Sequence, residues 1–199
     1  YGVHRNEVES DGIKIAGLVC RSFQEFFSRN DAVESVETYF LKNGIVGISE
    51  IDTRALVRHI RNKGAMNAII STENKNIDEL KSALAKVPNM EGLELSSKVS
   101  TTSPYIMGDE NAKFKVAVLD LGVKKNILRC LVERDCYLKV FPMNTSLEEI
   151  MDWKAHGYMI SNGPGDPGAM PEVVKKVKTI IDKGNKVFGI CLGHQIIAE

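Results

Sequence analysis

The chain has 199 residues, in which 26 lysines and arginines balance 26 aspartates and glutamates, and 43% of the residues are hydrophobic. This composition excludes a disordered chain, and the absence of a basic surplus argues against a nucleic-acid partner. No apolar run approaches the ~18 residues of a membrane span, so no membrane partner is expected. Cys20, Cys130, Cys136 and Cys191 form no CxxC pair, so neither a disulfide framework nor a metal site is expected, and a cytoplasmic location is the default.

The first half of the chain alternates short strand-like and helix-like segments. Apolar and β-branched runs predict strands, and helical spacing of apolar residues predicts helices. Asp52 stands where the N-cap of the second helix belongs. The predicted strands are Lys14–Cys20, Ile45–Ile48 and Met66–Ile70, and the predicted helices are Ala32–Lys42, Thr53–Asn62 and Ile77–Ala85.

The second half is more regular, because four apolar strands alternate with helical patterns. Such alternation indicates βαβ units and a parallel sheet with helices on both faces, an α/β fold. Between the halves, residues 94–112 are rich in Ser, Thr, Gly, Asn and Asp, which predicts a linker. The expected domains are 1–99 and 114–199, joined by 100–113. The predicted strands are Phe114–Leu119, Tyr137–Phe141, Gly157–Ile160 and Val187–Ile190, and the helices are Lys124–Glu133, Leu147–Trp153 and Pro171–Lys183.

Gly189 to Gly193 (GICLG) places Cys191 between two glycines, after a strand and before a helical pattern. This G-x-C-x-G pattern is the thiol version of a nucleophile elbow, in which close backbone packing exposes the nucleophile. The positive end of the following helix favours the thiolate, and the backbone N–H of Leu192 would point where an oxyanion forms. The alternative is that Cys191 is a small buried hydrophobic residue that ends a strand.

Residues 161–167 (SNGPGDP) form the second loop at the carboxyl edge of the predicted sheet, where ligands bind in folds of this type. Two glycines and two prolines predict a rigid loop with exposed backbone N–H groups. Such a loop could hold an anion or supply a second oxyanion donor opposite Cys191. Alternatively, it is an ordinary connection to a helix that begins at Pro171.

A thiol nucleophile needs a general base, and none is convincing among the four histidines. His194 is one helical turn beyond Cys191, but an elbow side chain points away from the helix that it precedes. His4, His59 and His156 have no supporting sequence context.

These loops resemble those of class I glutamine amidotransferases. FGICLGHQ at 188–195 and SNGPGDP at 161–167 resemble the two signature loops of that class, and DLGVKKN at 120–126 resembles its first strand-to-helix turn. The first half narrows the resemblance, since residues 44–64 (GIVGISEIDTRALVRHIRNKG) are similar to the amino-terminal domain of carbamoyl-phosphate synthase small subunits. Glutaminases of anthranilate synthase and guanosine monophosphate synthetase lack that domain.

The resemblance implies a flavodoxin-like amidotransferase domain behind a subunit-specific α/β domain. It implies that Cys191 attacks the side-chain amide of L-glutamine, forms a γ-glutamyl thioester and releases ammonia. Gly163 and Leu192 would bind the oxyanion, and Gly163, Gly165, Leu192 and Gln195 would line the glutamine site. Ammonia would pass to a large synthetase subunit that uses bicarbonate, ATP and Mg²⁺, while this chain itself needs no cofactor or metal.

The family's His and Glu partners of the cysteine follow the elbow at a distance, and the 199 residues end before them. We therefore expect an internal fragment with little glutaminase activity of its own. Two alternatives stay open: another cysteine hydrolase or amidotransferase of the same fold, and a catalytically silent regulatory subunit. The sequence does not distinguish a role in arginine synthesis from one in pyrimidine synthesis.

Overall fold

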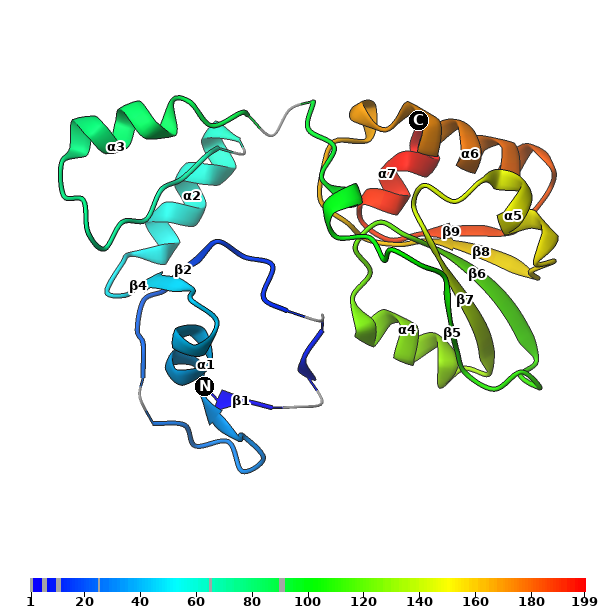
Figure 1. Ribbon diagram of the computed structural model, residues 1–199, viewed down its shortest axis with the longest axis horizontal. Helices are drawn as coiled ribbons and strands as arrows, with labels where there is room; N and C mark the ends of the chain where they lie inside the picture. Colours follow the sequence, from blue (N-terminus) through cyan, green and yellow to red (C-terminus); the bar gives the residue numbers. More distant parts are fainter. Residues whose placement is uncertain (1, 5–6, 10–11, 25, 65, 90–91) are drawn as a thin grey trace. The chain divides into compact units, whose positions relative to one another are not determined.

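The computed structural model describes residues 2–4, 7–9, 12–24, 26–64, 66–89 and 92–199. The chain forms two compact units, residues 1–90 and 91–199 (Figure 1). Every hydrophobic side chain that is fully buried among the described residues belongs to the second unit.

The described residues of the first unit form short strands and three α-helices, as the sequence predicts for an α/β domain. β1 (Gly2–Val3) pairs antiparallel with β3 (Glu34–Ser35), and β2 (Gly17–Val19) pairs parallel with β4 (Val46–Ile48). The predicted N-cap Asp52 is confirmed, because its carboxylate accepts the backbone N–H of Ala55 at 2.9 Å. The helices are α1 (Val36–Lys42), α2 (Thr53–Lys63) and α3 (Ile77–Leu84).

Two predictions in this unit need correction. The helix expected from Ala32 begins only at Val36, because the side chain of Ser35 caps it by accepting the N–H of Thr38. The strand expected at Met66–Ile70 is absent. Instead, the side-chain amide of Asn67 donates to the carbonyls of Val87 and Pro88, both at 3.0 Å, so this segment is fastened by a side chain and not by a strand ladder.

The second unit contains a five-stranded sheet in the order β5-β7-β6-β8-β9. The four later strands run parallel, and β5 joins the edge antiparallel to β7. Reading only the parallel strands by their order in the chain gives 2-1-3-4, the flavodoxin-like order. The strands are β5 (Tyr105–Met107), β6 (Phe114–Asp120), β7 (Cys136–Pro142), β8 (Gly157–Ile160) and β9 (Val187–Gly189).

Helices cover both faces of this sheet, which confirms the predicted architecture (Figure 1). Side chains alternate along β6, so that Ala117 and Leu119 face one layer and Val118 faces the other. The layer on the Leu119 side contains α5 (Leu147–Asp152), α6 (Pro171–Asp182) and α7 (Leu192–Ala198). The opposite layer contains α4 (Lys125–Val132), whose Leu128 is fully buried.

The segment 100–113, which composition predicts as a linker, belongs to the second unit. It contains β5, whose Tyr105 lies in register with Val140 of β7. A short 3₁₀ helix, η2 (Ser96–Lys98), precedes it, and Ser96 is completely buried. The division of the chain falls between residues 90 and 91 because the polar residues that follow make hydrogen bonds to the sheet's loops.

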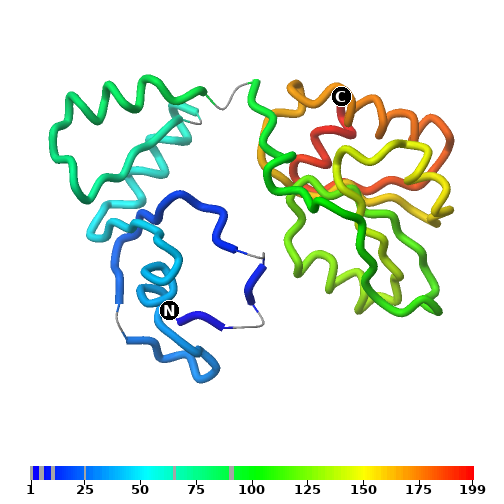
Figure 2. Tube along the Cα trace, viewed as in Figure 1, coloured from blue at the N-terminus to red at the C-terminus, as the bar shows by residue number. Residues whose placement is uncertain are grey.

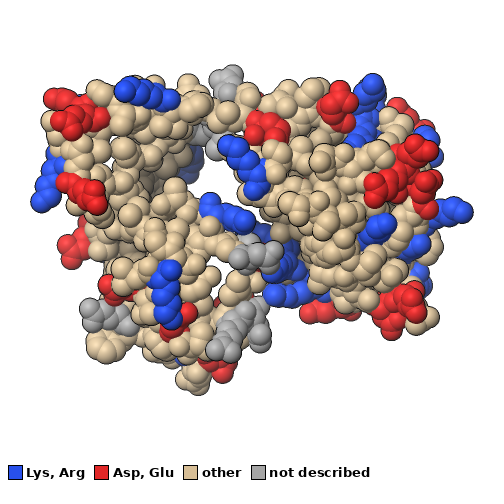
Figure 3. All heavy atoms as spheres, viewed as in Figure 1, with Lys and Arg blue, Asp and Glu red and all other residues tan. Residues whose placement is uncertain are grey.

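Acidic and basic side chains lie intermixed on the visible face of the second unit, in keeping with the balanced charge of the chain (Figure 3). Within the described residues, no helix is both long enough and apolar enough to cross a bilayer.

Candidate active site

Three parallel strands of the second unit end side by side. Leu119 of β6 is in register with Ile160 of β8, and Ile160 is in register with Gly189 of β9. The loops that follow these strands therefore leave the same edge of the sheet. Because β7 and β8 lie on opposite sides of β6, the edge between β6 and β8 is the topological switch point, where folds of this type bind ligands.

Cys191 occupies a strained turn between β9 and α7, as the elbow pattern predicts. Its φ of 54° and ψ of −114° are uncommon for a residue that has a side chain, and the residue is exposed. The strain persists because the backbone on both sides is held: Gly193 donates its N–H to the carbonyls of Ser161 at 3.1 Å and Ile190 at 3.0 Å. The alternative of a buried cysteine at the end of a strand is therefore wrong.

The two glycines of the elbow are required by close packing. A Cβ added to Gly189 would lie under 3.0 Å from the backbone of Gly193, and one added to Gly193 would lie under 3.0 Å from the carbonyls of Ile160 and Ser161. Any side chain at either position would push the turn away from the end of β8. The elbow thus packs directly on the first residue of the 161–167 loop.

The 161–167 loop is also tied to the turn after β6. The hydroxyl of Ser161 accepts the N–H of Leu121, and the side chain of Asn162 accepts the N–H of Lys124 and donates to the carbonyl of Gly122. A Cβ on Gly163 would lie under 3.0 Å from the backbone of Leu121. Several side-chain and backbone contacts therefore hold Gly163 in place.

The backbone N–H groups of Leu192 and Gly163 lie at this edge and can bind an anion. Among the hydrogen bonds of the described residues, none uses the N–H of Leu192 or that of Gly163. Leu192 is buried and directly follows Cys191, while Gly163 lies in the loop on which the elbow packs. Donors of this kind can stabilise the oxyanion of an acyl-transfer intermediate.

The remaining predicted site residues lie close to these loops. Gly165 has a φ of 115° and forms an isolated antiparallel bridge with Glu94. Gln195 is exposed on α7, and its backbone N–H donates to the carbonyl of Cys191 at 3.1 Å. Within the described parts of the chain, no histidine side chain makes a hydrogen bond with Cys191; His194 reaches it only through its backbone N–H, which donates to the Cys191 carbonyl at 3.0 Å. His156 accepts from the backbone of Lys115, and His194 is exposed.

Sequence reasoning missed Asp120 at the end of β6. Its carboxylate is 4% exposed and accepts three backbone N–H groups, from Gly122 and Val123 at 2.8 Å and from Thr101 at 2.7 Å. It therefore shapes the turn after β6 and fixes a segment from before the sheet. The sequence offered one signal for this role, an aspartate at the end of an apolar strand. A buried carboxylate without hydrogen-bond donors would destabilise the fold, so such a residue is expected to have partners.

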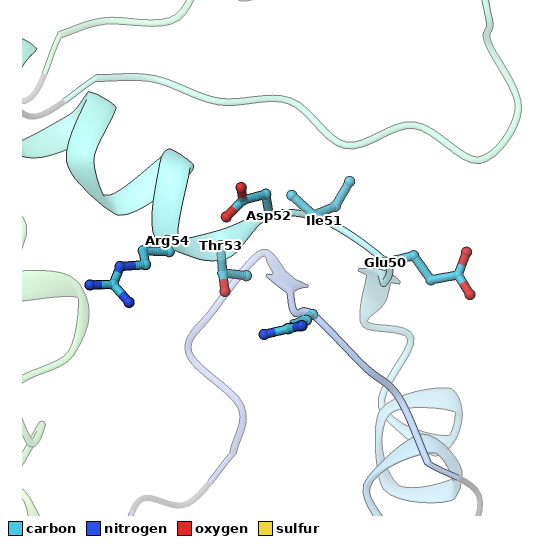
Figure 4. A pocket seen from close by; sticks show the side chains of 6 residues that line it. Glu50, Ile51, Asp52, Thr53 and Arg54 are labelled. Atoms are coloured by element: carbon cyan, nitrogen blue, oxygen red, sulfur yellow. The ribbon is translucent and has the colours of Figure 1, made fainter.

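The first unit also has a pocket, lined by Arg21 and by residues 50–54. Figure 4 shows that its side chains do not converge, because Glu50 and Arg54 point away from each other at opposite ends of the segment. Within the described residues, no group of three or more His, Cys, Asp and Glu is placed to hold a metal ion. The elbow and the 161–167 loop are therefore the candidate site.

Comparison with known proteins finds matches for both halves of the chain. Residues 117–199 match the family model of glutamine amidotransferase class-I, and residues 1–70 match that of the carbamoyl-phosphate synthase small chain, CPSase domain. The two halves of the chain are thus similar to two successive domains, the second an amidotransferase domain and the first that of carbamoyl-phosphate synthase small chains. The four parallel strands end, and the cysteine elbow lies, within the part of the chain that matches glutamine amidotransferase class-I.

The chain is also similar to curated proteins from several organisms. Two of them, from Chlorobaculum tepidum and a Synechococcus species, are named carbamoyl phosphate synthase small chain. They are 36% and 38% identical to the chain over its whole length, and the chain covers 55% and 54% of their own lengths. A protein of Oryza sativa subsp. japonica, named carbamoyl phosphate synthase small chain, chloroplastic, is 36% identical and is covered to 47%. The chain thus spans about half the length of the curated relatives it matches.

Proposed function

We propose that this protein is the glutamine-hydrolysing subunit of a carbamoyl-phosphate synthase. The observation that carries the proposal is the exposed thiol of Cys191 in a strained elbow, which packs on a loop whose Gly163 N–H makes no other hydrogen bond. The strain is maintained by the surrounding backbone, as is common at catalytic nucleophiles.

In the proposed mechanism, the thiolate of Cys191 adds to the side-chain carbonyl carbon of L-glutamine, and the carbonyl electron pair moves to the oxygen. The backbone N–H groups of Leu192 and Gly163 bind that oxyanion. Collapse of the intermediate breaks the C–N bond, and the protonated nitrogen leaves as ammonia. Water then adds to the γ-glutamyl thioester, glutamate leaves, and the thiol is regenerated.

The other site residues bind glutamine in this proposal. Gly165 leaves the loop without a side chain, so that the substrate can approach its backbone. Gln195, one turn after Cys191 on α7, offers an amide to the polar end of glutamine. A His and a Glu of the complete subunit act as base and orienting carboxylate.

The proposed partner is the large synthetase subunit, which consumes the ammonia together with bicarbonate and ATP and uses Mg²⁺ as a cofactor. Its product serves arginine or pyrimidine synthesis. We place the protein in the cytoplasm, because its free cysteines fit a reducing compartment, although one plant relative is named chloroplastic.

The test replaces Cys191 by serine in the complete subunit assembled with its synthetase. Glutamine-dependent synthesis of carbamoyl phosphate should be lost, while synthesis from added ammonia should survive. Cys130→Ser, at a half-buried thiol of α4, is the matched control and should keep both activities. Retention of glutamine-dependent synthesis by Cys191→Ser would refute the proposal. Absence of glutamine hydrolysis in the wild-type complex would favour a silent regulatory subunit or another cysteine hydrolase.

A further inference from the structure

Residues 92–101, here called the strap, run along the loops at the carboxyl edge of the sheet before the sheet itself begins. In Figure 2 the strap, in green, descends beside the orange loop that follows β8. It reaches three different loops of the second unit. Its contacts are Gly92 N–H and Leu93 carbonyl to Asp166, Ser96 hydroxyl to the Pro164 carbonyl, Thr101 N–H to Asp120, and Ser100 hydroxyl to the Met143 N–H.

Asp166 makes two hydrogen bonds with the strap, more than any other described residue of the 161–167 loop. One carboxylate oxygen accepts the N–H of Gly92 at 3.0 Å, and the other accepts the N–H of Gly168 at 2.9 Å. The backbone N–H of Asp166 itself donates to the carbonyl of Leu93 at 3.1 Å. The N–H groups of Gly92 and Gly168 lower the pKa of this carboxyl, because they stabilise its ionised form.

The connection from Asp166 back to Gly163 has little freedom. A Cβ on Gly165 would lie 3.1 Å from the carbonyl of Leu93, so the strap touches the loop backbone here as well. Pro164 has a restricted φ, and its carbonyl accepts the hydroxyl of the fully buried Ser96 at 2.8 Å. The direction of the Gly163 N–H therefore depends on how the loop is fastened to the strap.

We propose that Asp166 is a positioning residue, which holds the 161–167 loop against the strap so that the Gly163 N–H faces the oxyanion. The inference rests on the proposed function, because it concerns the rate of glutamine hydrolysis. The strap lies between the two family matches, which end at residue 70 and begin at residue 117. The inference gives the strap a role in catalysis, through Asp166. The thiol of Cys191 belongs to a different loop, and its intrinsic access to small reagents does not depend on Asp166.

The experiment compares Asp166→Ala and Asp166→Asn with the control Asp109→Ala in the complete subunit with its synthetase. Asp109 resembles Asp166 because its carboxylate also accepts the N–H of the residue two positions later, that of Asn111 at 2.9 Å. Unlike Asp166, Asp109 lies in the turn before β6, away from the carboxyl edge of the sheet. Removing one oxyanion donor lowers kcat by a factor of ~10²–10³. A Gly163 N–H that points in the wrong direction should therefore lower kcat for glutamine by about tenfold or more.

Two assays are run on each variant. The first gives kcat and KM for glutamine hydrolysis. The second gives the rate at which iodoacetamide alkylates Cys191, a displacement that forms no oxyanion. Asp166→Ala should lose kcat with a smaller change in KM, and its alkylation should stay within about twofold of wild type. Asp166→Asn keeps one acceptor oxygen, so its kcat should fall less than that of Asp166→Ala. Asp109→Ala should match wild type in both kcat and the alkylation rate.

The outcomes separate the inference from the proposed function. Unchanged kcat in Asp166→Ala overturns the inference and leaves the proposed function standing. A parallel fall of both rates in Asp166→Ala and Asp166→Asn, together with a lowered melting temperature, shows a structural role only and also overturns it. A wild-type complex that hydrolyses no glutamine overturns both.

Discussion

The hydroxyl oxygen of Ser161 accepts a hydrogen bond from the backbone N–H of Leu121 at 2.9 Å and donates one to the carbonyl of Asn162 at 2.8 Å. Ser161 and Leu121 are both completely buried. This single hydroxyl therefore joins the loops that follow β6 and β8 at the switch point. No water is needed to satisfy either backbone group.

Replacing Ser161 by alanine should destabilise the second unit. The buried N–H of Leu121 would lose its acceptor, and an unsatisfied buried donor costs about 1–3 kcal/mol. Urea denaturation should show that loss in the free energy of unfolding. Ser97→Ala, at an exposed neighbour of the buried Ser96, is the control and should change stability by no more than ~0.5 kcal/mol. Equal stability of the two variants would contradict the role of this hydroxyl.

Replacing Gly193 by alanine should disrupt the elbow. The added Cβ would collide with the backbone of Ile160 and Ser161, which cannot move without disturbing β8. We expect the free energy of unfolding to fall by ~3 kcal/mol or more, the upper end of the ~1–3 kcal/mol that overpacking costs. If the proposed function holds, glutamine hydrolysis is lost as well. Gly157→Ala, where the nearest atom would be 3.6 Å from the added Cβ, should fold normally. Thermal melting of both variants tests this prediction, and a Gly193→Ala variant as stable as Gly157→Ala would contradict it.

Replacing Cys191 by glycine should stabilise the protein relative to Cys191→Ala. A residue with a side chain at φ 54° and ψ −114° is strained by ~1–3 kcal/mol, and glycine relieves that strain. The gain is reduced by the greater freedom of glycine in the unfolded chain, ~0.4–1 kcal/mol. Denaturant titration of the glycine and alanine variants should therefore show the glycine variant to be more stable by about 1 kcal/mol. A more stable alanine variant would show that the turn is not strained.

Lys176 of α6 should make the stability of the second unit depend on pH in the alkaline range. Its ammonium group donates to the carbonyls of Met143 and Thr145, and burial lowers its pKa below the ordinary 10.5. Between the folded pKa and 10.5 the unfolded chain binds more protons, so the contribution of Lys176 to stability rises with pH through that window.

The measurement compares the free energy of unfolding of wild type and Lys176→Met at pH 8 and at pH 10.5. The difference, wild type minus variant, should be larger at the higher pH. Lys178→Met, at an exposed position of the same helix, is the matched control and should change the slope less. A difference that shrinks as the pH rises would contradict the prediction.

The parallel strands and the elbow were predictable because their signals are local. Apolar runs of four to seven residues mark β6, β7 and β8, and two glycines around Cys191 mark the turn. The resemblance to class I amidotransferases was carried by those same short segments. Local pattern failed at residues 66–70, whose apolar run finds no strand partner among the described residues.

The roles of Asp120 and of the strap could not be predicted from the sequence. Gly92 and Asp166 are 74 positions apart, and Thr101 and Asp120 are 19 apart, so no periodicity links them. The polar composition of the strap is typical of a loop. Composition cannot distinguish a segment whose polar groups bind water from one whose polar groups bind the loops of a sheet.

The position of β5 and the strap has a practical consequence for dividing the protein. The amidotransferase match begins at residue 117, yet the physical folding unit begins some 25 residues earlier. A fragment that starts at residue 117 would lack residues 114–116 of β6 and all of β5. Without β5 the edge of β7 would be exposed, and Asp120 would lose its hydrogen bond from Thr101. Open strand edges promote aggregation, so such a fragment should express poorly, whereas one that starts at residue 92 should remain folded.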